Sequence, residues 1–124
     1  MNRFLIAASV LALVSAPALA GDDVMAGYYG NTVVAAGGMV ESHTHYRADH
    51  TFDVSATAMG QSYNFKGTWS VDDKGQLCRT YADPAPPNTP NPLCLPAEAH
   101  KVGDTWTVSM NGNSRTLTLK AGVE

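Results

Sequence analysis

The fold is decided by residues 67–78, whose sequence is Gly67-Thr68-Trp69-Ser70-Val71-Asp72-Asp73-Lys74-Gly75-Gln76-Leu77-Cys78. Polar and apolar residues alternate on both sides of a polar turn, which is typical of two strands joined by a hairpin. Gly75 suits the left-handed position of a three-residue loop. This loop places Trp69 in the core opposite Arg79, within reach of a cation–π contact, and puts Cys78 on the other face of the sheet.

The same alternation recurs along the chain, with turn signals about every ten residues and no convincing helical period. The expected strands span residues 28–36, 39–47, 51–59, 62–71, 76–82, 104–110 and 113–120, with a short additional strand near 92–95. Seven or eight antiparallel strands in about 100 residues predict an all-β fold. We expect a small up-and-down β-barrel, with a β-sandwich as the alternative.

The turns between strands follow from parity, because a shift of one residue moves every side chain to the other face. The apolar faces of 39–47 and 51–59 are both even-numbered, so an odd loop must join them. We therefore expect a three-residue turn at 48–50 with His50 in the left-handed conformation. This turn sets Asp53 opposite His45.

Two further hairpins are expected. Gly60-Gln61 fits a two-residue turn with Gly first, and Asn111-Gly112 between alternating strands is a strong hairpin signal. The resulting cross-strand pairs are Phe52 with Trp69, Val54 with Gly67, and Trp106 with Leu117.

Residues 1–20 have the pattern of a secretory signal peptide. Arg3 precedes an apolar run, and Ala18 and Ala20 fit a small-residue cleavage site. The run is too short to span a bilayer. We expect cleavage after Ala20, a single domain at 21–124 without a transmembrane segment, and a periplasmic or secreted location.

Charge argues against one class of partner. Removal of residues 1–20 leaves 7 basic against 11 acidic residues, a net charge of −4, and the basic residues are scattered singly. Nothing forms a stripe that would bind phosphates, so nucleic acid is not an expected partner.

Cys78 and Cys94 are the only two cysteines. In an exported chain, such a pair predicts a disulfide. It would fasten the loop 82–97, which contains six of the seven prolines, to the outside of the sheet. This loop is expected to be a plain connection or a polyproline-like arm.

Several motifs carry a resemblance to a known family. They are Gly30-Asn31-Thr32-Val33, Tyr46-x-Ala48-Asp49-x-Thr51-Phe52, Gly67-Thr68-Trp69-Ser70-Val71, Leu77-Cys78, Cys94 and Gly103-Asp104-x-Trp106. Together they resemble a group of small exported proteobacterial proteins with calycin-like domains of unknown function. The chain departs from that pattern at His50, where the family has Gly. The resemblance implies a lipocalin-like β-barrel, but no activity and no site residues.

The expected barrel interior is the first candidate site. Its candidate ligand-binding residues are Tyr46, Phe52, Tyr63, Phe65, Trp69, Arg79 and Trp106. A small barrel is either filled by side chains or holds one small ligand, and at this chain length we expect a filled interior. A cavity of about 300 Å³ or more would instead favour a ligand, which would be a small apolar molecule.

A strand face with two histidines is the second candidate site. His43 and His45 alternate on one face and Asp53 lies opposite, a set that could bind Cu²⁺ or Zn²⁺. No other cofactor is expected. The face is expected to point to solvent, so a merely solvated pair is the favoured interpretation.

Catalysis has less support. Ser62 and Ser70 lack a nucleophile-elbow pattern, and the expected disulfide removes both thiols. We therefore expect a non-enzymatic protein that binds a small apolar ligand or a partner protein in the periplasm. The alternatives are Cu or Zn binding through His43 and His45, and inhibition of a secreted or periplasmic hydrolase through segment 84–96 or 21–27.

Overall fold

The structure is a computed structural model and describes residues 21–110 and 112–124. The expected signal peptide and the turn residue Asn111 lie outside the described residues. The elements are the 3₁₀ helix η1 (Gly21–Tyr28) and the strands β1 (Thr32–Gly37), β2 (Val40–Tyr46), β3 (Thr51–Ala58), β4 (Gln61–Val71), β5 (Gln76–Tyr81), β6 (Leu93–Pro96), β7 (Thr105–Met110) and β8 (Asn113–Lys120). The predicted all-β fold is confirmed.

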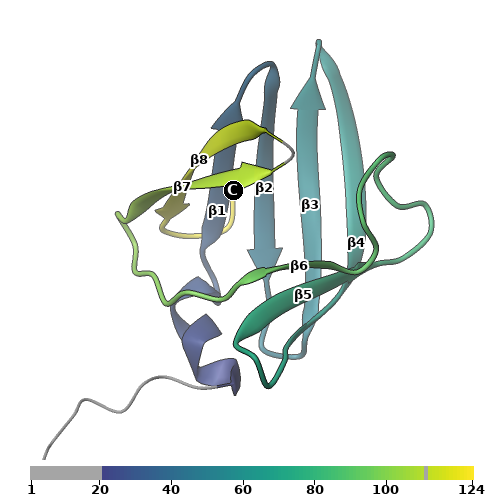
Figure 1. Cartoon of the computed structure of the whole chain (residues 1–124). Coiled ribbons are helices and arrows are strands. Elements are labelled where there is room, and N and C mark those ends of the chain that lie inside the picture. The colour runs from purple at the N-terminus through teal and green to yellow at the C-terminus, as the bar shows by residue number, and fades with distance from the viewer. Residues whose placement is uncertain (1–20, 111) are drawn as a thin grey trace, which may run out of the picture.

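The strands form one antiparallel sheet in the order β6-β5-β4-β3-β2-β1-β8-β7. The sheet curls into a half-barrel: the β7–β8 flank crosses in front of β1 and β2, and the β5–β6 flank crosses in front of β2 and β3 (Figure 1). The arrangement is therefore a barrel-like single sheet rather than the two sheets of a sandwich. The edge strands β6 and β7 stand at opposite ends of the strand order, so the half-barrel is open between them.

Most of the predicted register is confirmed. His50 and Gly75 both have the left-handed conformation expected of hairpin loops, with φ of 71° and 77°. The confirmed cross-strand pairs are His45 with Asp53, Trp69 with Arg79, and Trp106 with Leu117. The parity of apolar residues was sufficient to find these pairs.

The predicted turn between β3 and β4 is wrong by one position. Met59 and Gly60, both at positive φ, form the turn, and Gln61 is already the first residue of β4. Two consecutive left-handed residues match the twist of the flanking strands, which favours this turn. The true pairs are Phe52 with Gly67 and Val54 with Phe65. Because the register shifts by two residues, each side chain keeps its expected face.

The segment before β1 is also different from the expectation. The sequence predicted no helix and a strand from residue 28, but residues 21–28 form a 3₁₀ helix and β1 begins at Thr32. Val24, Met25 and Tyr28 of this helix are buried in the core. The helix lies at the end of the half-barrel where β2 turns into β3 (Figure 1). Burial of these three side chains explains why the segment packs inward instead of extending the sheet.

The absence of a side chain at Gly67 lets strand β5 and the Phe52 ring approach strand β4 closely. A Cβ atom at this position would overlap the backbone carbonyl oxygen of Thr80 and lie 3.0 Å from Cε1 of Phe52. Phe52 is itself 1% exposed, so its ring has little room to move. Only glycine fits where the β5 flank folds over the inner face of the sheet.

We predict that Gly67→Ala destabilises the fold by about 1–3 kcal/mol, because the added methyl group must displace the Thr80 carbonyl or the Phe52 ring. Ser70→Ala on the exposed face of the same strand is the matched control and should change stability by less than about 0.5 kcal/mol. The measurement is the free energy of unfolding in urea. Equal values for both variants would contradict a tight approach at Gly67.

Candidate ligand-binding cavity

The interior of the half-barrel contains a cavity of about 390 Å³. Its lining residues come from all eight strands and from the connection between β5 and β6: Val33, Ala35, Val40, Ser42, Thr44, Tyr46, Val54, Ala56, Phe65, Arg79, Tyr81, Pro86, Thr89, Leu93, Leu95, Val108, Asn113, Arg115 and Leu117. The expectation of a filled interior is therefore wrong. The volume falls in the range of pockets that hold small molecules.

A row of small side chains leaves this space open. Ala35 of β1 pairs with Ser42 of β2, and Ser42 pairs with Ala56 of β3, so the three lie side by side on the inner face. The largest fully buried side chains, among them Met25, Phe52 and Trp69, lie elsewhere in the core. These bulkiest buried side chains therefore do not fill the cavity.

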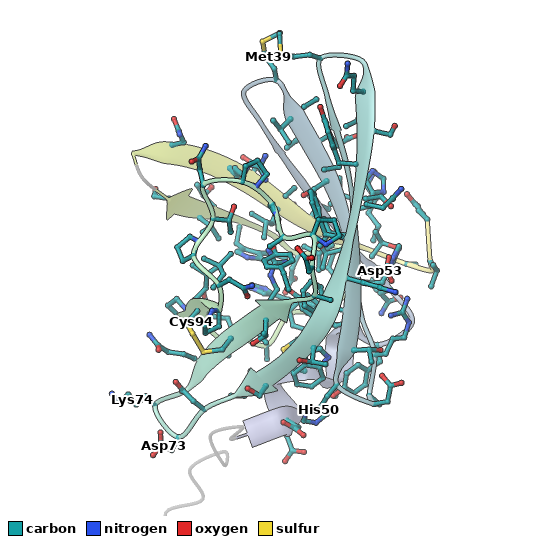
Figure 2. All side chains as sticks on the ribbon, turned by 90° about the vertical axis from the view of Figure 1, so that its right-hand side faces the viewer. Met39, His50, Asp53, Asp73, Lys74 and Cys94 are labelled. Atoms are coloured by element: carbon teal, nitrogen blue, oxygen red, sulfur yellow. A yellow bond between two sulfur atoms is a disulfide. The ribbon has the colours of Figure 1, made fainter. Side chains whose placement is uncertain are left out.

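The proline-rich connection forms one wall of the cavity through Pro86 and Thr89. The side chain of Asn91 fixes it to β5: its Oδ1 accepts from the Tyr81 N–H at 2.8 Å, and its Nδ2 donates to the Tyr81 carbonyl at 3.1 Å. The predicted disulfide between Cys78 and Cys94 is confirmed and joins β5 to β6. Cys94 lies on the side of the β5–β6 flank away from Asp53 (Figure 2).

Arg79 crosses the interior from β5 to β2. Its Nη1 donates to the Tyr46 hydroxyl at 3.2 Å, and its Nη2 donates to the Tyr81 hydroxyl at 2.6 Å. The guanidinium carbon lies 5.4 Å from the ring centroids of both Phe52 and Tyr81. Three aromatic side chains therefore hold the charged group at the cavity wall.

The cation–π contact expected between Arg79 and Trp69 is replaced by another arrangement. The His50 ring stacks on Trp69 with 4.3 Å between ring centroids, and its Nε2 lies 2.7 Å from the Asp22 carboxylate of η1. His50 and η1 lie at one end of the molecule, opposite Met39 (Figure 2). The His50 ring covers a face of Trp69, and the Arg79 guanidinium lies against Phe52 and Tyr81 instead.

Arginine is the only charged residue type among the described residues that line the cavity: Arg79 and Arg115 are present, and no aspartate or glutamate is. Burial raises the pKa of the Tyr81 phenol above its ordinary value, even though the Arg79 charge acts in the opposite direction. Tyr81 therefore stays neutral at physiological pH. The cavity is therefore largely apolar, with the positive charges of Arg79 and Arg115 in its wall.

The predicted ligand-binding residues fall into two groups. Tyr46, Phe65 and Arg79 line the cavity. The residues outside the lining are Phe52 and Trp69, which are buried in the core, Trp106, which packs against it, and Tyr63, which is 44% exposed. Tyr81 and Arg115 also line the cavity but were not among the predicted ligand-binding residues. Parity could have indicated both. Tyr81 lies two residues after the inward-facing Arg79, and Arg115 lies two residues before the inward-facing Leu117.

The predicted metal residues form a different kind of cluster. His45 Nδ1 lies 3.0 Å from Asp53 Oδ2, and its Nε2 lies 3.0 Å from the backbone oxygen of Glu124. Arg47 also pairs with Asp53, whereas His43 lies 3.5 Å from Glu41. In 21–110 and 112–124, no group of three or more His, Cys, Asp or Glu side chains is placed to hold a metal ion.

The expected solvent exposure of this face is wrong at His45, which is only 9% exposed. The residues after β8 fold back over the sheet: the Gly122 carbonyl accepts from the Thr32 hydroxyl at 2.7 Å, and the Glu124 N–H donates to that hydroxyl at 2.9 Å. His45 is consequently a hydrogen-bonded structural residue with both ring nitrogens engaged.

Comparisons of the chain with protein-family models, with curated proteins and with solved structures found no match in any of the three. None of the helices in the described part of the chain is long and apolar enough to cross a membrane. The disulfide fits a chain that resides outside the reducing cytoplasm. The class defined by fold and site is thus a disulfide-linked half-barrel with an internal cavity.

We predict that Asp53→Asn lowers the free energy of unfolding at pH 7 by about 1–3 kcal/mol, because His45 and Arg47 lose a charged partner. Burial acts to raise the pKa of Asp53, but hydrogen bonds from these two residues outweigh it and hold the pKa below its ordinary value. A depressed carboxyl pKa stabilises the fold above the unfolded-state value, and this stabilisation is lost as pH falls through the folded-state value.

The difference between wild type and Asp53→Asn should therefore shrink below about pH 4. Urea unfolding at a series of pH values from 7 to 3 measures it. Asp73→Asn in the exposed β4–β5 turn is the control and should match wild type. A constant difference down to pH 3 would contradict a charged role for Asp53.

Proposed function

We propose that this chain is an exported, non-enzymatic binding protein that holds a small, largely apolar molecule inside the half-barrel. The observation that carries this proposal is the cavity of about 390 Å³ whose walls come from all eight strands. Ligand pockets are usually concave, mostly apolar spaces of about 300–1,000 Å³ with a few polar groups. The cavity has these properties.

The composition of the wall favours binding over catalysis. The described lining residues hold no histidine, cysteine or carboxylate. These side chains most often act as general acids and bases, so Ser42 has no such base among the described lining residues to activate it as a nucleophile. An aliphatic wall with two arginines and two tyrosines can instead select a ligand by shape and by a small number of polar contacts.

The proposed location is the periplasm or the extracellular space. The signal-like pattern of residues 1–20 and the disulfide between Cys78 and Cys94 support it together. The resemblance to calycin-like exported domains agrees with both the location and a ligand cavity, as an argument from analogy.

The alternative functions have less support. Each of the two segments considered as contacts for a partner protein or a hydrolase has residues packed inside the molecule: Val24 and Met25 are buried in the core, and Pro86 and Thr89 line the cavity. The metal alternative depends on His45 and Asp53, which already bond to each other. The cavity is therefore the feature that best explains this architecture.

We predict that the purified protein binds N-phenyl-1-naphthylamine, a neutral apolar dye, in a saturable manner, and that Ala35→Leu weakens binding by about tenfold or more. Ala35 lines the cavity, and the added atoms occupy ligand space. The readout is dye fluorescence in a titration, with thermal unfolding as a check on folding.

Ala36→Leu is the matched control, because Ala36 is the next residue of β1 and is exposed on the outer face. It should bind the dye like wild type. Absence of saturable binding, or equal loss in both variants, would overturn the proposed use of the cavity.

A further inference from the structure

Arg79 is the most unusual group in the interior. Two of its nitrogens donate to the hydroxyls of Tyr46 and Tyr81, and its Nε is buried with no hydrogen-bond partner among the described residues. A guanidinium is always charged in proteins and can only donate. The wall of the cavity therefore presents a positive group whose bonding capacity is only partly used.

No carboxylate of the described chain balances this charge. The ion pairs found in 21–110 and 112–124 involve His43, His45, Arg47, His50 and His100, and neither cavity arginine takes part in one. Arg115, the second arginine of the lining, comes from β8 on the other flank. The protein as a whole carries a net charge of −3, so the positive cavity is not a consequence of overall composition.

A buried positive charge without a negative partner is costly in free energy. If Arg79 served only to close the wall of the cavity, a leucine or methionine at this position would do so without that cost. The guanidinium is instead positioned with aromatic rings against it and two phenol groups beside it. This arrangement is one that a negatively charged partner inside the cavity would complete.

The two tyrosines add to the donor character of the site. In their bonds to Arg79, both phenol oxygens act as acceptors, so each O–H proton is free to be donated elsewhere. A planar guanidinium with neighbouring O–H donors matches the planar, acceptor-only oxygens of a carboxylate. A cationic group would meet donors and positive charge only.

We propose that the ligand is an amphipathic carboxylate, whose anionic group lies against Arg79, Tyr46 and Tyr81 while its apolar part fills the space over the small row Ala35, Ser42 and Ala56. Arg115 supplies a second positive charge at the wall. This inference rests on the proposed function, because it names the class of molecule that the same cavity holds.

The test compares three molecules with the same alkyl chain: decanoate, decan-1-ol and decylamine, titrated into the purified protein by calorimetry at pH 7.5. Decanoate should bind about tenfold or more tightly than decan-1-ol, since hydrogen bonds to a charged group are stronger than neutral ones. Decylamine should bind most weakly. Equal or weaker binding of decanoate relative to decan-1-ol would overturn the proposal.

Variants assign the preference to Arg79. Arg79→Met should remove the preference for decanoate, so that the ratio of the decanoate affinity to the decan-1-ol affinity falls to about one, because the charge that distinguishes the two molecules is lost. Lys74→Met, in the exposed turn between β4 and β5, is the control for the loss of one positive charge. A decanoate preference that survives in Arg79→Met would overturn the assignment.

A second pair of variants keeps the test informative where Arg79→Met fails to fold. Arg79→Lys retains the charge but lacks the planar fork, and should lower the ratio of the decanoate affinity to the decan-1-ol affinity without removing the preference altogether. The double variant Tyr46→Phe/Tyr81→Phe removes both O–H donors and should also reduce the preference for decanoate over decan-1-ol. Unchanged decanoate affinity in both would contradict the proposed contacts.

The two proposals fail in distinguishable ways. Binding of decan-1-ol without preference for decanoate overturns the carboxylate inference and leaves the apolar cavity function in place. Absence of binding by all three molecules overturns both.

Discussion

The close approach of β5 to β4 at Gly67 is the constraint on which the rest of the structure depends. The Thr80 carbonyl occupies the space that a Cβ atom would fill, and the Phe52 ring covers the other side. This approach lets the β5–β6 flank turn over the inner face of the sheet (Figure 1). The turned flank places Arg79 and Tyr81 across the interior from Tyr46, so both the cavity wall and its charged group follow from one missing side chain.

The interior has two regions, one of which stabilises the fold while the other leaves space for a ligand. The helix η1 adds Met25 to the buried aromatic rings of Phe52 and Trp69, and this region holds the sheet in its curled shape by apolar burial. The row of Ala35, Ser42 and Ala56 lies outside this packed region and lines the cavity. A filled interior of the same size would be more stable, because empty space forfeits packing contacts. The open row is thus a feature that stability alone does not explain.

The candidate site was only partly predictable from the sequence. Parity correctly placed Tyr46 and Arg79 on the inner face, and the same reasoning extends to Tyr81. It did not reveal the cavity, because the three small residues come from three different strands and become neighbours only in the folded sheet. Nor did it show that His45 is buried, since the covering residues follow β8 and are distant in the sequence.

The sequence by itself determined most of the strand pattern after residue 31, most turns, the disulfide and which face of the sheet most side chains take, because an antiparallel ladder repeats every two residues and leaves few alternatives. It did not determine the β3–β4 turn, where Gly60 can serve as either turn residue and the choice rests on the twist of the strands. Only the tertiary structure decided how far the sheet curls and what lies across the interior. Contacts such as Arg79 with Tyr46 join strands that are not hydrogen-bonded neighbours, and local alternation carries no information about them.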